Sequence, residues 1–209
     1  MTQINYYSKA LWGVFLLLFC TVISAQQAVP NQKPSINAVR IDTPIELTGK
    51  LDNPQWNKAT PFELNYEIRP GDNTQSKQKT SARILYDNEF LYFGFDCLDD
   101  DPKSIRANVS DRDKIYNDDF VIVVFDTYGD YQKSYEFAVN PFGNQGDLLA
   151  TMGNEDASMD YIWYSAASLN DHGWTAELKI PFKSLAFTEK EEHTWPLHVI
   201  RTIPRESRY

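Results

Sequence analysis

Ten short runs rich in β-branched and aromatic residues, each bounded by turn-forming residues, limit this chain to few architectures. Side chains that alternate between apolar and polar lie on opposite faces of a strand, and closely spaced strands of this kind are typical of two packed antiparallel sheets. We therefore predict an all-β fold, an antiparallel β-sandwich of the immunoglobulin-like or jelly-roll-like type with one or two short helical turns. The predicted strands are residues 36–41, 62–66, 81–86, 90–97, 120–126, 134–140, 146–152, 162–169, 174–180 and 195–203.

Local signals place the connections between these strands. Asp87 and Asn88 tolerate turn conformations and stand between two alternating runs, so they predict a hairpin. The segment 170–173 predicts a second hairpin in the same way. A capping Asn53 followed by Pro54 predicts a short helical turn over 53–59, and residues 101–105 form a second candidate turn.

The segment 120–125 is apolar on both faces, unlike its neighbours, which alternate. A strand of this kind is central in its sheet, with its second face covered or lining an apolar groove. Cys97 is the single cysteine after residue 25 and shares a strand face with Phe93 and Phe95, so we expect a buried, unreactive thiol.

The first 25 residues have the pattern of a signal peptide. Lys9 precedes the apolar run 11–23, which is shorter than the roughly 20 residues of a bilayer-spanning helix, and Ser24 and Ala25 form a small-residue cleavage site. We therefore expect an exported protein that is periplasmic, outer-membrane-associated or secreted. Residues 26–35 carry two prolines and no periodicity, which predicts a flexible tether before a single domain over residues 36–209.

Charge and motifs exclude several classes of function. Loss of Lys9 with the signal peptide leaves 19 basic against 29 acidic residues, and this excess of negative charge disfavours nucleic acid as a partner. The chain has no nucleophile elbow, zinc-protease motif or phosphate-binding glycine loop, so we predict no enzyme activity for the domain itself, whatever the activity of the full-length protein, and no cofactor. The aspartate-rich loops do not have the spacing of a calcium loop, so solvated acidic loops are the favoured interpretation and we predict no metal ligands.

Four segments, 45–59, 85–92, 117–126 and 177–182, resemble in order and spacing the sequence motifs of family 9 carbohydrate-binding modules. The resemblance extends from about residue 40 to residue 205. A further likeness, at 112–113, 140–147 and 201–205, is to a subgroup that stands at the N-terminus of large exported bacterial proteins with a β-barrel-like remainder. The resemblance therefore implies a domain cut from a longer protein, with a downstream domain of the same polypeptide as a partner.

Members of the family clamp a sugar between two aromatic rings and surround it with charged and amide side chains. The first aromatic position falls at Tyr116 and an amide position at Asn140, and we expect these two residues to lie near a shared outer groove. An acidic position of the family is Ile122 here, and an arginine position on the next strand is Ala138. The second aromatic position has no obvious counterpart before Tyr209.

Three further residues complete the predicted carbohydrate site: Asp119 and Arg112, which stand in the matching segments, and Trp163. Because Trp163 and Tyr164 are adjacent, one of the two rings faces outward whichever way the strand lies. The resemblance implies a non-catalytic carbohydrate-binding domain of a larger exported protein involved in polysaccharide binding or breakdown.

Two alternatives remain open from the sequence. In the first, the domain has lost sugar binding, as Ile122 and Ala138 suggest, and packs as a structural or interaction domain on a downstream outer-membrane barrel. The second and weaker alternative is a haem-binding sandwich, with Met152 or Met159 as a ligand.

Overall fold

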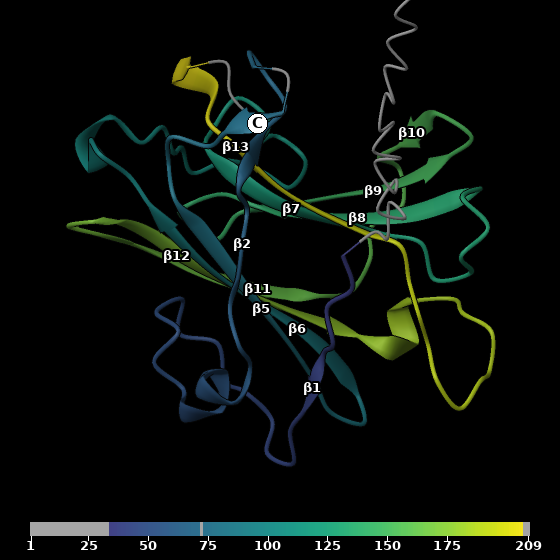
Figure 1. The fold of residues 1–209 in the computed structure, drawn as a ribbon. Coiled ribbons are helices and arrows are strands. Elements are labelled where there is room, and N and C mark those ends of the chain that lie inside the picture. The colour runs from purple at the N-terminus through teal and green to yellow at the C-terminus, as the bar shows by residue number, and fades with distance from the viewer. Residues whose placement is uncertain (1–33, 72, 207–209) are drawn as a thin grey trace, which may run out of the picture. The chain divides into compact units, whose positions relative to one another are not determined.

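Two β-sheets form the body of the chain in this computed structural model, which describes residues 34–71 and 73–206 (Figure 1). The predicted signal peptide, residues 1–25, and all but the last two residues of the predicted tether lie outside the described residues. The described residues confirm the all-β antiparallel sandwich. Their helical structure consists of short 3-10 turns, namely η1 (Pro54–Lys58), η2 (Pro102–Ser104), η3 (Phe182–Ser184) and η4 (Pro204–Glu206).

The first sheet is built around two long hairpins. Its strands in spatial order are β1 (Val39–Arg40), β5 (Thr80–Tyr86), β6 (Phe90–Leu98), β12 (Gly173–Pro181) and β11 (Tyr164–Asn170), and β2 (Phe62–Glu63) also pairs with β5. All pairs are antiparallel except β1 with β5. The predicted hairpin at Asp87 is confirmed, because its Oδ1 accepts hydrogen bonds from the backbone N–H groups of Glu89 and Phe90.

The second sheet is antiparallel throughout. Its strands in spatial order are β10 (Asn154–Asp156), β9 (Gln145–Thr151), β8 (Lys133–Val139), β7 (Phe120–Phe125) and β13 (Leu197–Thr202). Strand β7 lies between β8 and β13, as its apolar sequence predicts. A separate two-stranded ribbon joins β3 (Tyr66–Glu67) and β4 (Thr74–Gln75).

The main differences from the predicted strands concern short, polar segments. The predicted strand 62–66 is divided between β2 and β3, and neither β4 nor β10 was expected. These elements are two or three residues long and lack an apolar alternation, so only their pairing with a neighbour defines them as strands.

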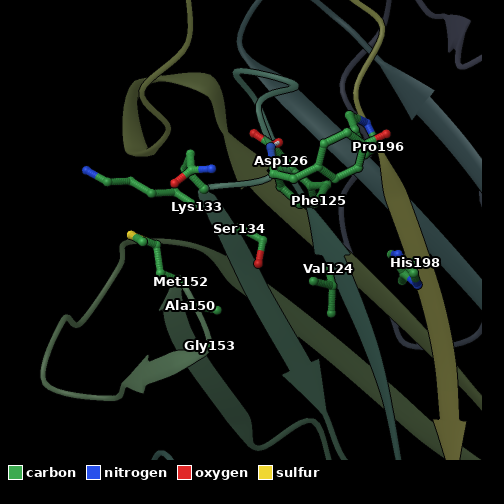
Figure 2. Close-up of a pocket in the computed structure, with 12 residues that line it drawn as sticks. Val124, Phe125, Asp126, Lys133, Ser134, Ala150, Met152, Gly153, Pro196 and His198 are labelled. Atoms are coloured by element: carbon green, nitrogen blue, oxygen red, sulfur yellow. Dashed lines mark hydrogen bonds between the residues drawn. The ribbon is translucent and has the colours of Figure 1, made fainter.

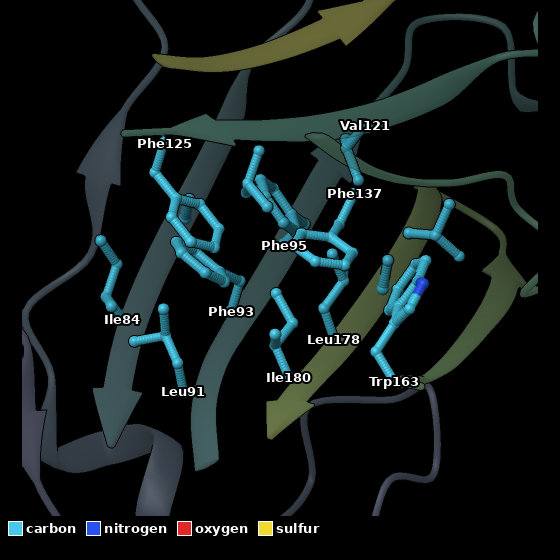
Figure 3. Packing of buried hydrophobic residues seen from close by; sticks show 14 of the residues in the cluster. Ile84, Leu91, Phe93, Phe95, Val121, Phe125, Phe137, Trp163, Leu178 and Ile180 are labelled. Atoms are coloured by element: carbon cyan, nitrogen blue, oxygen red, sulfur yellow. The ribbon is translucent and has the colours of Figure 1, made fainter. Parts of the chain in front are cut away.

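The core lies between the sheets and is rich in aromatic rings (Figure 3). Phe125 of β7 stacks on Phe93 of β6 with ring centroids 6.2 Å apart and on Phe137 of β8 at 5.8 Å. Such pairs add about 0.5–1.5 kcal/mol each beyond the burial of their area. Cys97 is fully buried, as predicted, and burial raises the pKa of its thiol to about 12.

The side of the second sheet that faces away from the core is called here the outer face. Val121, Val123 and Phe125 belong to the core, so the residues between them in β7 point outward. The register of the sheet brings the outward residues of its strands together. The outer face consists of Phe120, Ile122, Val124, Ser134, Glu136, Ala138, Gly146, Leu148, Ala150, Glu155, His198, Ile200 and Thr202.

The N-terminal segment of the domain covers the corresponding side of the first sheet. Trp56 of η1 is buried there and donates a hydrogen bond from its indole N–H to Oε1 of Glu177 in β12, at 2.8 Å. Gly49 has a φ of +78°, and a Cβ at this position would lie 2.7 Å from the backbone of Ala167. Only glycine fits both the conformation and this close approach.

Candidate functional site

Tyr116 lies at one end of the outer face, where β7 begins. Its ring meets that of Phe120 edge-on, with centroids 5.6 Å apart, and its side chain is 36% exposed. Gly146 of β9 makes room for the hydroxyl group, because a Cβ at this position would lie 2.8 Å from the Tyr116 oxygen. The ring is therefore supported by the sheet on one side and open on the other.

The electrostatic surroundings of this ring are negative. Burial raises the pKa of Tyr116 above its ordinary value, and the negative charges of Asp113, Glu136, Asp147 and Glu155 raise it further. The phenol therefore stays neutral at physiological pH and can donate as well as accept a hydrogen bond.

Glu136 lies on the outer face in the middle of β8. Burial raises the pKa of its carboxyl group, and the charge of Glu155 on β10 raises it further. Its direct neighbours across the sheet are the apolar Val124 and Leu148. A carboxyl group in these surroundings can exchange hydrogen bonds with a polar ligand.

Asn140 is fully buried, and its amide is committed to the adjoining loops. Its Nδ2 donates to the carbonyl oxygen of Asn108 and to Oδ2 of Asp118, both at 2.9 Å. Its Oδ1 accepts from the backbone N–H groups of Phe142 and Asn144. Both donor and both acceptor positions of the amide are thus occupied. The structure does not bring Asn140 to a surface shared with Tyr116, because these four hydrogen bonds hold it inside.

Asp119 is also fully buried and holds the chain on either side of β7. Its Oδ2 accepts from the backbone N–H of Arg106 at 2.9 Å, and its Oδ1 lies 3.3 Å from Nη1 of Arg205. Burial raises the pKa of this carboxyl group, whereas these two partners act in the opposite direction. Asp119 therefore organises the loops and presents no free oxygen to the outer face.

Arg112 and Trp163 meet at the edge of the sandwich rather than on the outer face. Arg112 pairs with the buried Asp147 and lies over the Trp163 ring, 5.9 Å from its centroid. Trp163 is 4% exposed and packs against Phe137 in the core, whereas Tyr164 is 49% exposed. The expectation that one of the two rings faces outward is confirmed for Tyr164, and burial removes Trp163 from the candidate stacking surfaces.

The floor beside Tyr116 is apolar. Ile122 and Ala138 are direct partners across β7 and β8 and are 8% and 0% exposed. Together with Ile115 and Phe120 they form a small apolar cluster on the outer face. The two positions at which the family resemblance implies polar side chains therefore supply a buried apolar surface in this chain.

A groove of about 220 Å³ lies at the opposite end of the outer face (Figure 2). Val124 and Ser134 project into it from neighbouring strands, with Met152 on one side and His198 on the other. Tyr131 also lines the groove. The outward parity of these strand positions was readable in the sequence, but the groove depends on how the β7–β8 loop and the turn after β9 are placed, and sequence analysis missed it.

The loop between β7 and β8 is held by one buried carboxylate. Oδ1 of Asp126 accepts from the backbone N–H groups of Tyr128 and Gly129, both at 2.9 Å, and Oδ2 accepts from that of Tyr131 at 2.7 Å. Burial alone would raise the pKa of Asp126, but these backbone hydrogen bonds outweigh it and lower the pKa below its ordinary value.

The lowered pKa of Asp126 predicts a loss of stability in acid. A folded-state pKa below the unfolded value stabilises the fold above the ordinary carboxyl pKa of about 4, and this contribution is lost as the pH falls through the folded-state value. We expect the free energy of unfolding of Asp126→Asn, measured with urea between pH 6 and pH 2.5, to vary less with pH than that of the wild type. Equal pH dependence in both proteins would contradict this assignment.

Two general features of the described chain bear on function. Among residues 34–71 and 73–206, no three histidine, cysteine, aspartate or glutamate side chains lie close enough together to bind a metal ion. No helix in the same residues has the length and apolar character needed to cross a membrane.

One known family matches most of the domain. Residues 47–200 match the family described as carbohydrate family 9 binding domain-like. No curated protein matches the chain.

Solved structures with this fold include carbohydrate-binding proteins of 15% sequence identity. One is a protein of Bacteroides uniformis to which carbohydrate binding is provisionally ascribed, with a TM-score of 0.65 over 84% of this chain and 86% of that one. Another is a family 9 carbohydrate-binding module of Caldicellulosiruptor kristjanssonii. Its complex with glucose has a TM-score of 0.56 over 78% of this chain and 75% of that one. Its complex with cellotriose has a TM-score of 0.56 over 84% of this chain and 81% of that one.

Proposed function

This chain belongs to the carbohydrate family 9 binding domain-like family, and from this membership we propose that its outer face binds the sugar rings of a carbohydrate without catalysing their breakdown. The observation that carries the proposal is the half-open ring of Tyr116, supported from below by Phe120 and Gly146. An exposed aromatic ring can cover the apolar C–H face of a pyranose. The neutral hydroxyl of Tyr116 and the carboxyl group of Glu136 supply hydrogen-bonding groups near it.

One ring by itself gives weak binding. Stacking on a single aromatic contributes about 1–2 kcal/mol, which corresponds to a Kd no better than tens of millimolar. Ile122 and Ala138 offer no hydrogen bonds from their side chains to sugar hydroxyl groups. Useful affinity therefore requires contacts beyond those of Tyr116.

Replacing Tyr116 by alanine should lower sugar affinity about tenfold or more, because the stacking surface is lost. Isothermal titration of the domain with glucose, galactose, mannose, xylose and N-acetylglucosamine, and with soluble polysaccharides of each, measures this effect. Tyr116→Phe keeps the ring and separates stacking from the hydroxyl group, and Tyr66→Phe, on the exposed β3, is the matched control. Absence of heat with every carbohydrate, or equal affinity of wild type and Tyr116→Ala, would reject the proposal.

We further propose that the domain belongs to a larger exported protein that binds or degrades polysaccharides. The signal-peptide pattern of residues 1–25 and the resemblance of segments 140–147 and 201–205 to N-terminal domains of barrel-containing proteins support this context. In this setting the domain holds the polysaccharide while the rest of the polypeptide acts on it. Cell fractionation of the full-length protein tests the expected periplasmic, outer-membrane or secreted location.

The apolar floor favours a second candidate function, in which the outer face packs on a downstream domain of the same polypeptide. Val124 and Ile200, which are half-buried and pack against Ile122 and Ala138, would then contact the downstream domain. Co-purification of the separately expressed domain with the downstream region tests this candidate. An Ile122→Glu variant that stays folded but no longer co-purifies would support it, and sugar binding that competes for the same face would argue for the first candidate.

A further inference from the structure

We propose that the groove at the far end of the outer face is a second carbohydrate subsite, with Tyr131 as its stacking ring, so that the domain binds a chain of sugar units along β7. This inference rests on the proposed carbohydrate binding at Tyr116. It adds a binding site for a further sugar unit of the same carbohydrate.

The two ends of the proposed site lie on one continuous surface. Phe120 supports Tyr116 at the start of β7, and Val124 forms part of the groove near the end of the strand. Both side chains point away from the core, because Val121 and Val123, which alternate with them in β7, belong to it. Ser134 of β8 and Ala150 of β9 are register partners, and both line the groove. At about 3.4 Å per residue, the four steps from Phe120 to Val124 span roughly 14 Å, which is longer than a single sugar ring.

Tyr131 has the position and the exposure of a stacking ring. It is 68% exposed, lines the groove and has a φ of +58°, a conformation that a non-glycine residue rarely adopts. Its backbone N–H donates a hydrogen bond of 2.7 Å to the buried Asp126 carboxylate, and this bond stabilises the conformation. The loop is therefore organised before a ligand arrives, which reduces the entropy that binding must remove.

The lining of the groove combines an apolar floor with a few polar groups. Val124 and Ala150 provide the floor, while the Ser134 hydroxyl and the His198 imidazole provide donors and acceptors within the same groove (Figure 2). Small-molecule sites commonly have this composition. A volume of about 220 Å³ is below the roughly 300–1,000 Å³ of pockets for drug-sized ligands, so the groove suits one sugar ring of a longer chain.

The groove also carries little of the positive charge expected of an anion site. Lys133 is the one lysine or arginine among its lining residues, and Asp126 is present as well. The carboxyl groups of Glu136 and Glu155 lie on the same face. A neutral, hydroxyl-rich ligand fits these surroundings better than a phosphate or sulfate group.

Titration with glucose and with cello-oligosaccharides of two to six units tests the second subsite. We expect the affinity of the wild-type domain to rise about tenfold with chain length and then to level off once both subsites are occupied. Tyr131→Ala should remove this rise while leaving the Kd for glucose unchanged. Tyr128→Ala removes an exposed ring from the same loop that does not line the groove, so it should behave as the wild type.

The outcomes separate this inference from the proposed function. Affinity that does not change with chain length, or a Tyr131→Ala variant with the chain-length dependence of the wild type, overturns the second subsite while the Tyr116 site stands. A domain that binds neither these sugars nor any carbohydrate of the wider panel overturns both proposals. Thermal unfolding of each variant shows whether the loss of chain-length dependence is caused by the missing ring or by a damaged fold.

Discussion

The free energy of unfolding should fall by about 3–5 kcal/mol when Glu177 is replaced by alanine, because its carboxylate is the single acceptor shared by three buried or half-buried donors. Its Oε2 accepts from the backbone N–H groups of Thr48 at 2.7 Å and Gly49 at 2.6 Å, and its Oε1 accepts from the Trp56 indole at 2.8 Å. Glu177 is fully buried at the centre of β12.

The reason for so large an effect is that these donors lose their partner without gaining water. Each unsatisfied buried donor costs about 1–3 kcal/mol, and all three donors lie in the segment that contains Gly49 and Trp56. Urea unfolding followed by tryptophan fluorescence measures the loss. Glu46→Ala, at an exposed position in the same segment, is the control and should change stability by less than about 0.5 kcal/mol.

Glu177→Gln refines this result. It retains one carbonyl oxygen but brings an amide N–H toward groups that also donate, so its stability should lie between that of the wild type and that of Glu177→Ala. An alanine variant within about 1 kcal/mol of the wild type would show that the carboxylate does not hold the N-terminal segment in place.

The strands and their faces could be predicted from the sequence because the two-residue period is a local property. Tyr135, Phe137 and Val139 share a face in the sequence pattern, and all three belong to the core. Asp87 defines its hairpin through hydrogen bonds to residues two and three positions further along, which is also a local effect. The antiparallel sandwich follows from many such local signals.

The candidate site was less predictable because it depends on contacts between distant residues. The sequence could not show that the amide of Asn140 is consumed by Asn108 and Asp118, which lie 32 and 22 positions away. It also left open which of the Trp163 and Tyr164 rings is buried, because a period of two fixes alternation but not direction. The family resemblance identified Tyr116, whereas Tyr131 became a candidate only when the loop held by Asp126 placed it beside the outer face.

Arg201 connects the two sheets through a buried ion pair. Its Nη2 lies 3.0 Å from Oδ2 of Asp99, which follows β6, and its Nη1 donates to the carbonyl oxygen of Leu98 at 2.7 Å and to the Thr80 hydroxyl at 3.2 Å. Arg205 also pairs with Asp99, at 2.5 Å. This network joins β13 of the second sheet to β5 and the end of β6 in the first.

Replacing Arg201 by methionine should lower the free energy of unfolding by about 3–5 kcal/mol, because it leaves the buried Asp99 carboxylate with one fewer cation and the Leu98 carbonyl without this donor. Arg40→Met, at an exposed arginine of β1, is the control and should have a much smaller effect. If the pair is the cause, Arg201→Met combined with Asp99→Asn will cost less than the sum of the two single changes, by about 1–3 kcal/mol. Strictly additive losses would instead assign the role of Arg201 to its packing and its carbonyl contact, with the two sheets joined by their apolar core.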